Sequence, residues 1–282
     1  MDKTSVIGII LGIIAVGVGM VLKGADIAAL LNPAAMLIIF VGTAAAVLIS
    51  FPGRTIKKIP ALFKIIFTNQ KQTEIPELIV LFTEMAEQTR REGLLSLEKQ
   101  VNEIDDSFLR PGIQMVVDGQ APEFIKEVML EKIDAMERRH QEGAAVFSQA
   151  GTYAPTLGVL GAVVGLVAAL KDMSDMATLG HAISAAFIAT LFGIFTGYVL
   201  WHPFASKLKE KSKNEVLIKE VMLEGILSIT NGDSAIVVRD KLSSFLSEKR
   251  ISQVGGKQGC DGRRSNLNNT QMNPGSFLIQ IC

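Results

Sequence analysis

The sequence has few of the residues that catalytic and metal centres require. Its only cysteines, Cys260 and Cys282, lie near the C-terminus, and its only histidines are His140, His181 and His202. Two cysteines so placed predict neither a disulfide framework nor a metal site. The sequence also contains no P-loop, no Gly-x-Ser-x-Gly turn and no His–Glu zinc pattern. It therefore predicts no catalytic residue, no cofactor, no metal and no enzymatic activity.

Charged residues are also unevenly distributed along the chain. Four long stretches contain no Asp, Glu, Lys or Arg. The 28 basic residues balance the 28 acidic ones, so no general affinity for nucleic acid is implied. Nearly half of the chain (49%) is hydrophobic, and its mean hydropathy is +0.35. A helix needs about 20 apolar residues to cross a bilayer core. We therefore predict an all-α membrane protein with four transmembrane helices and a large helical cytoplasmic domain, the uncharged stretches being 4–22, 27–53, 143–170 and 176–206.

Basic residues predict how these helices are oriented. Clusters of them follow the second and fourth uncharged stretches, whereas the two short connectors carry one lysine each, Lys23 and Lys171. Because positively charged flanks stay in the cytoplasm, both termini and the long central region are expected there. The first stretch is not expected to be a cleaved signal peptide, since Val21-Leu22-Lys23 is no small-residue cleavage site.

Five segments follow from this topology. Residues 1–52 form a first transmembrane hairpin and 151–204 a second, with a cytoplasmic helical domain at 53–150 between them. Cytoplasmic helices follow at 205–251, and 252–282, rich in Gly, Asn, Ser and Gln, is expected to be disordered. In the central domain, 59–67 is amphipathic and predicts a helix at the membrane surface or one packed on other helices. The helix that starts at Pro122 meets no stop signal before Gly143, so we expect it to continue into the third span.

Small residues mark the second hairpin. Gly161 and Gly165, and likewise Gly193 and Gly197, lie four residues apart and place bare backbone on one helix face. In lipid such faces allow close helix packing. Glycine is also frequent in membrane helices generally, so the spacing alone leaves both interpretations open.

No carboxylate lies near the centre of any span, although a proton relay or cation site usually needs one. Helices three and four instead carry hydroxyls, among them Thr156 and Thr190. These line a wetted path, or each bonds back to its own helix carbonyl. If the protein conducts ions, another chain must supply the titrating group. Pro155 and Pro203, near the cytoplasmic ends of the same helices, predict either a hinge or ordinary helix ends.

The densest mixture of charges lies between Arg90 and Glu98. Arg91 and Glu98 share a face if one helix continues through Gly93, and Glu87 forms a surface pair with Arg91 worth a few tenths of a kcal/mol. Composition alone gives no reason to prefer an interaction surface here over a solvated face.

Several motifs together resemble the MotA family of flagellar stator subunits, of the Bacillus type. The resemblance covers about residues 1–250 and is most specific in helices three and four. Those two helices are similar, more loosely, in the energisers ExbB and TolQ, which have fewer spans. The motifs are Met1-Asp2-Lys3-Thr4-Ser5, Asn32-Pro33-Ala34-Ala35, Phe51-Pro52, Ala154-Pro155-Thr156-Leu157-Gly158, Gly165-Leu166-Val167, Ala189-Thr190-Leu191-Phe192-Gly193 and Trp201-His202-Pro203-Phe204-Ala205.

The resemblance implies a subunit of the bacterial plasma membrane that forms a ring, a pentamer, around a MotB-type dimer. Each partner helix supplies the proton-carrying aspartate. It implies that Arg90 and Glu98 contact the rotor protein FliG, that Pro155 and Pro203 are coupling prolines, and that Thr190 lines the ion path. Sodium-driven members have a threonine in helix three where this chain has Ala162, which favours protons.

The expected function is thus a proton channel that converts proton-motive force into rotor torque. Three alternatives stay open: a sodium-driven stator, an ExbB/TolQ-like energiser of an envelope protein, and a membrane scaffold that conducts nothing.

Overall fold

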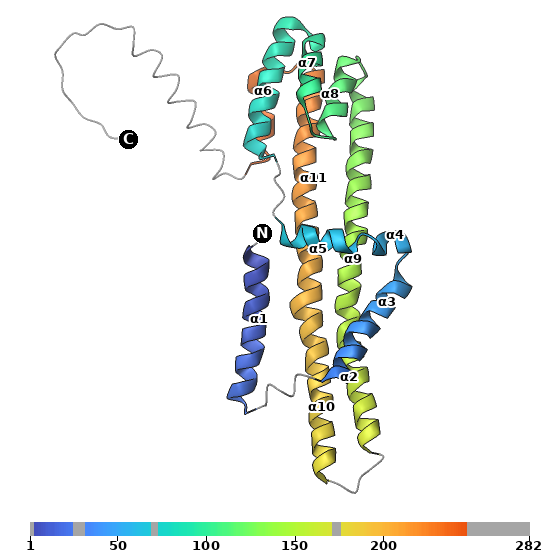
Figure 1. Cartoon of the computed structure of the whole chain (residues 1–282). Helices are drawn as coiled ribbons and strands as arrows, with labels where there is room; N and C mark the ends of the chain where they lie inside the picture. Colours follow the sequence, from blue (N-terminus) through green and yellow to red (C-terminus); the bar gives the residue numbers. More distant parts are fainter. Residues whose placement is uncertain (1–2, 25–31, 69–72, 171–175, 247–282) are drawn as a thin grey trace, which may run out of the picture. The chain divides into compact units, whose positions relative to one another are not determined.

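The computed structural model describes residues 3–24, 32–68, 73–170 and 176–246, and their regular elements are all helices (Figure 1). Two compact units share the chain. Unit 1 takes residues 1–72 and 130–217, and unit 2 takes residues 73–129 and 218–282. Helices α9 and α11 contribute residues to both units. The predicted tail at 252–282 lies outside the described residues.

Four helical segments of the described chain are long and apolar enough to cross a membrane, which confirms the predicted fold class. The first is α1 (Lys3–Leu22). The second joins α2 (Pro33–Met36), a π-helical stretch η2 (Leu37–Val41) and α3 (Gly42–Ser50). Asn32 caps its start, because its side-chain oxygen accepts a hydrogen bond from the Ala35 N–H at 3.2 Å.

The third span belongs to α9 (Pro122–Ala169), which runs without interruption from the restart at Pro122 through Pro155. The prediction that this helix continues into the third span is confirmed. The fourth span is α10 (Met176–Phe195), which continues through the π-helical stretch η4 (Thr196–Trp201) into α11 (His202–Thr230). Neither proline therefore marks a helix end, since Pro203 is the second residue of α11.

Glycines bring α9 and α10 into backbone contact. A Cβ atom added at Gly158 would lie 2.9 Å from the Gly193 Cα, and one added at Gly197 would lie 2.7 Å from the Gly151 carbonyl oxygen. The close approach predicted for Gly193 and Gly197 is thus confirmed. Within this chain Gly161 has only ordinary contacts and Gly165 has no neighbouring atom within 4 Å, so both interpretations of this glycine pair stay open. The matching glycines of α9 lie seven residues apart, at 151 and 158.

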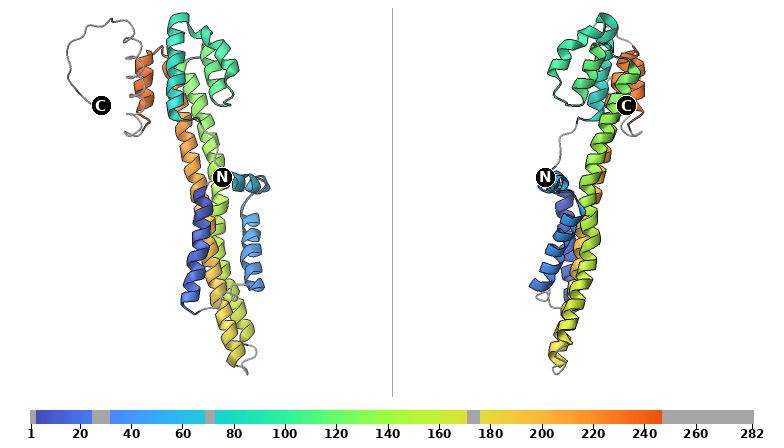
Figure 2. Two further views of the ribbon diagram at one scale, coloured as in Figure 1. Left: turned by 60° about the vertical axis from the view of Figure 1, so that its left-hand side comes forward. Right: turned by 90° about the vertical axis from the view of Figure 1, so that its right-hand side faces the viewer.

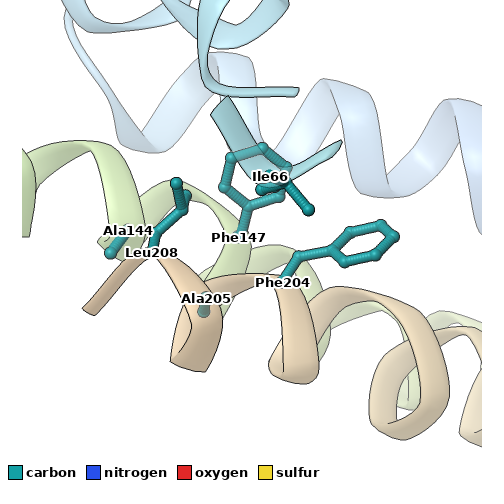
Figure 3. Close-up of a cluster of buried hydrophobic side chains, with 6 residues drawn as sticks. All are labelled: Ile66, Ala144, Phe147, Phe204, Ala205 and Leu208. Atoms are coloured by element: carbon teal, nitrogen blue, oxygen red, sulfur yellow. The ribbon is translucent and has the colours of Figure 1, made fainter. Parts of the chain in front are cut away.

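Aromatic side chains hold the amphipathic helix α5 (Ile59–Phe67) against the second hairpin within unit 1. Ile66 of α5 is fully buried against Phe147 of α9 and against Phe204 and Leu208 of α11 (Figure 3). The Phe63 ring meets the rings of Phe147, Trp201 and Phe204 edge-on, at centroid distances of 5.1, 6.4 and 6.1 Å. Lys211 donates hydrogen bonds to the last carbonyls of α5, at Ile65 and Thr68. The sequence left two alternatives for residues 59–67, a helix at the membrane surface or one packed on other helices. The structure shows the packing on other helices.

Unit 2 is a separate helical cluster. Its elements are α6 (Ile75–Glu92), the 3-10 turn η3 (Leu94–Leu97), α7 (Glu98–Glu103), α8 (Leu109–Val117), the start of α9, the end of α11 and α12 (Ala235–Ser243). Glu74 and Glu77 form a capping box at the start of α6. Phe82 packs on Gly225, where an added Cβ would lie 2.6 Å from the ring. The last described helix, α12, begins after Ser234, whose side chain caps it, and ends at Ser243.

We predict that Gly193→Ala destabilises the second hairpin. Its methyl group would meet the backbone of Gly158 and the Ala154 carbonyl, which cannot move aside as a flexible side chain does. Overpacking of this kind costs about 1–3 kcal/mol. Thermal unfolding of the detergent-purified protein should show a lower midpoint for Gly193→Ala and an unchanged one for Gly165→Ala. Equal midpoints for the two variants would contradict the packing described here.

Candidate functional site

The threonine hydroxyls of the second hairpin bond back to their own helices. Thr156 donates to the Tyr153 carbonyl at 2.8 Å, Thr190 to the Ala186 carbonyl at 3.2 Å, and Thr152 to the Ser148 carbonyl at 3.2 Å. This back-bonding was one of the two alternatives for Thr156 and Thr190. Each bond uses the O–H donor only, so the oxygen atoms keep lone pairs that can accept from water or a partner.

Thr152 and Thr156 lie on a face of α9 that the first hairpin does not cover. Residues of α9 that meet α2 and α3 include Tyr153, whose hydroxyl lies 2.9 Å from the Ser50 hydroxyl, and Leu157, which contacts Gly42. Thr152 and Thr156 point elsewhere around the helix and are exposed. Figure 2 shows the same arrangement within unit 1, because α1, α3 and α5 gather on one side of α9 and α10 in its right-hand view.

Ala162 and the two prolines take different positions around this hairpin. Ala162 is half-buried on α9. The Pro155 ring packs against Gly197, where an added Cβ would lie 2.7 Å from it. Pro203 is exposed and follows directly on the π-helical turn of η4. Since a proline N–H is missing and a π turn widens the helix, this stretch of the fourth span is the least regular part of it.

Arg90 and Glu98 lie on separate elements of unit 2. Helix α6 ends at Glu92, and Gly93 adopts φ +83°, a left-handed value that ends the helix. The condition under which Arg91 and Glu98 would share a face, one helix continuing through Gly93, is therefore not met. Arg90 and Glu98 are both exposed. The predicted pair of Glu87 and Arg91 is present at 3.9 Å and is largely solvated.

Two glutamines fix the turn between these charged residues. The Gln88 amide N–H donates to the Ser96 carbonyl at 3.2 Å, and its oxygen accepts from the Gln100 amide at 2.6 Å. The bonds connect α6 with η3 and α7, the elements that carry Arg90 and Glu98. Sequence reasoning missed them, because a glutamine pair 12 residues apart has no recognisable periodicity.

An ion pair between Lys219 and Asp106 stabilises unit 2. Lys219 of α11 donates to Asp106 at 2.9 Å and also lies 5.1 Å from the centre of the Phe108 ring. Burial opposes ionisation of Asp106, but bonds from Lys219 and the backbone N–H groups of Leu109 and Phe108 outweigh it, so its pKa lies below the ordinary value. The carboxylate therefore stabilises the fold near neutral pH, and this contribution is lost as pH falls through the lowered pKa.

A groove of about 440 Å³ lies between α9 and α11 in unit 1. Its walls include Glu137, His140 and Ser148 of α9, and Lys209 and Ser212 of α11. The His140 Nδ1 lies 3.0 Å from the Ser212 hydroxyl oxygen. No local signal connects His140 with Ser212, since they are 72 positions apart.

Taken together, fold and site define an integral membrane subunit with four spans, a carboxylate-free helix pair and a charged helical extension. Residues 100–221 match the MotA/TolQ/ExbB proton channel family, and residues 6–93 match the motility protein A N-terminal family. The chain belongs to the MotA/TolQ/ExbB proton channel family.

Individual relatives agree with this assignment. The chain is 60% identical over 249 residues to motility protein A of Bacillus subtilis, covering 88% of this chain and 92% of the relative. It is 31% identical over 256 residues to chemotaxis protein PomA of Vibrio alginolyticus, covering 90% and 99%. A chain in the structure of the flagellar MotAB stator complex from Bacillus subtilis superposes with a TM-score of 0.83, at 60% identity, over 88% of this chain and 97% of that chain.

We predict that Gly93→Ala distorts the turn between Arg90 and Glu98 without removing a charge. Alanine at a left-handed φ costs about 1–2 kcal/mol and would shift η3, which carries the Gln88 contact. Gly119→Ala is the matched control, since Gly119 has φ +71° in the same unit but lies between α8 and α9. Swimming speed should fall for Gly93→Ala and not for Gly119→Ala. A similar loss in both would mean that backbone strain alone is responsible.

Proposed function

We propose that the chain is a stator subunit of a flagellar motor that uses proton flow to drive a rotor. One observation carries this proposal: the second hairpin presents hydroxyls on an uncovered face, yet no acidic side chain lies along its uncharged stretches. Such a face can accept a partner helix but cannot by itself hold a proton. A single-helix partner of the MotB type would bring the missing aspartate.

The assembly that follows is a ring, a pentamer of this chain, around a dimer of that partner in the bacterial plasma membrane. A proton that crosses about 100 mV releases roughly 2.3 kcal/mol. Protonation of the partner's aspartate removes its charge and lets it pass the apolar and hydroxyl-bearing surface of α9 and α10. Thr156 and Thr190 would line this path, and Pro155 and Pro203 would couple it to the cytoplasmic helices.

In this proposal both termini and unit 2 are cytoplasmic, where the exposed side chains of Arg90 and Glu98 meet the rotor protein FliG. Their exposure at the end of α6 and the start of α7, two elements joined by the hydrogen bonds of Gln88, supports a contact surface. Charged surfaces of this kind steer each other through salt-sensitive attraction. Lipid surrounds the four spans, and no nucleic acid takes part.

Proton use, in place of sodium use, rests on Ala162. An alanine methyl offers no oxygen to a dehydrated sodium ion, which prefers oxygen ligands. The match of residues 6–93 to the motility protein A N-terminal family favours a stator over an ExbB/TolQ-like energiser.

The direct test expresses this chain with its partner in motile bacteria that lack their own stator. Tethered cells should rotate in medium from which sodium has been removed, because the path carries protons. Rotation that requires sodium would assign the chain to sodium-driven stators. Absence of rotation in both media, with the complex assembled and a working stator as control, would favour the energiser.

A second prediction concerns the rotor contact. Arg90→Glu and Glu98→Lys should each lower stall torque strongly, since each places like charges against the rotor, while membrane insertion stays intact. Arg110→Glu, a reversal in the same unit on α8, serves as the matched control. Torque measured on single tethered motors tests whether Arg90 and Glu98 contact the rotor. If the double reversal leaves torque unchanged, these two residues are not the contact.

A further inference from the structure

Helix α5 lies where the uncharged stretches of unit 1 end. Its Leu62 contacts Gly143, the first residue of the third stretch. Its Ile66 packs on Phe204, which lies two residues before the end of the fourth stretch (Figure 3). The second stretch ends at Gly53, six residues before α5 begins. Because charged residues begin where the bilayer core ends, α5 lies at the level of the membrane–water interface.

Aromatic side chains gather at the same level. Phe63 of α5 meets Trp201, the only tryptophan of the chain, with ring centroids 6.4 Å apart. Phe67 of α5 meets the Phe204 ring at 5.7 Å. Tryptophan is enriched at membrane interfaces, because its ring has an apolar body and a polar N–H group. The aromatic cluster thus agrees with an interfacial position of α5.

The side of α5 that faces away from the second hairpin is basic. Ile66 is buried against the hairpin, whereas Lys57 and Lys64 are exposed. These two lysines are seven residues apart, and the backbone between them is helical, so they project to one side. Lys58 is exposed as well, and so is Arg54 of α4 (Gly53–Ile56). We call Arg54, Lys57, Lys58 and Lys64 the interfacial cations.

No carboxylate of this segment offsets the interfacial cations. The sequence contains no Asp or Glu between Asp26 and Glu74. In the part of the chain that the structure describes, none of the interfacial cations forms an ion pair with a carboxylate. Four positive charges therefore lie within one short segment at the depth of the lipid headgroups, where an anion from outside the chain can approach them.

We propose that α4 and α5 form a binding surface for the headgroups of anionic phospholipids. Each lysine or arginine near an anionic membrane surface contributes about 1 kcal/mol, which is about fivefold in affinity. The lysine ammonium and the arginine guanidinium donate charge-assisted hydrogen bonds to phosphate oxygens. The apolar side of α5 is already covered by the second hairpin, so lipid meets its basic side. This proposal holds whether or not the chain drives a rotor.

The test is the lipid that the detergent-purified full chain retains. The chain is equilibrated with equal amounts of phosphatidylglycerol and phosphatidylcholine, separated from unbound lipid and analysed by mass spectrometry. Phosphatidylglycerol should be retained in several-fold excess, and high salt should reduce this excess, because salt screens exposed charges. The double variant Lys57→Gln, Lys64→Gln should lose most of the excess.

The matched control is the double variant Lys126→Gln, Lys132→Gln. It removes the same charge from exposed positions of α9, at least 11 residues before the third uncharged stretch, and should keep the excess. Lys57→Arg with Lys64→Arg keeps the charge at α5 and should keep the excess too. If the arginine variant loses it as the glutamine variant does, the two lysines act through packing, and the proposal is overturned.

Other outcomes would also overturn the proposal. Equal retention of the two lipids by the unmodified chain would show that no anionic headgroup is preferred. An excess that survives Lys57→Gln with Lys64→Gln would place the site elsewhere, and a loss shared with the α9 control would assign it to net charge alone. If inorganic phosphate displaces phosphatidylglycerol where chloride of equal ionic strength does not, the occupant is a free phosphate ion. Lipid retention without rotation would contradict only the proposed function.

Discussion

The backbone contact between α9 and α10 is the constraint on which the rest of unit 1 depends. In a bilayer the hydrophobic effect does not drive helices together, so dispersion contacts between closely spaced backbones must contribute. Gly158 against Gly193, and Gly151 against Gly197, supply that closeness. The contact sets the register of the two helices and leaves Thr152 and Thr156 of α9 exposed.

The two sides of this helix pair differ in what covers them. One side is covered by α3 and α5, and the aromatic cluster of Phe63, Phe147 and Phe204 fixes α5 there. The exposed side of α9 keeps the hydroxyls of Thr152 and Thr156, without any acidic group in the span. A helix pair that is packed against other helices on one side and exposed on the other is suited to hold a partner helix that moves past it.

Much of this arrangement was predictable because the bilayer imposes strong rules on sequence. The absence of charge located the four spans, and the lack of a stop signal before Gly143 predicted the continuous α9. The four-residue spacing of Gly161 and Gly165 shows only that a face is bare. Which bare face meets α10 depends on the register of two antiparallel helices, and that register is a tertiary property.

The candidate site was predictable only in part for the same reason. Thr156 and Thr190 stood out as hydroxyls in apolar stretches, and Arg90 and Glu98 as charges in a dense cluster. That Gly93 adopts a left-handed φ and separates the two charges was not evident from the helical period of their neighbours. The Gln88–Gln100 bond and the pairing of His140 with Ser212 join distant residues, which no local pattern reveals.

The central claim is that a partner helix carrying the missing carboxylate lies against the hydroxyl-bearing face of α9 and α10. Disulfide cross-linking tests it most directly, with Cys260 and Cys282 first replaced by serine. Cysteines would be placed at Thr190, at Ile49 of α3, which is 87% exposed, and beside the partner's membrane aspartate. The account predicts rapid cross-linking from Thr190→Cys and none from Ile49→Cys. Cross-linking from Ile49→Cys alone would contradict it.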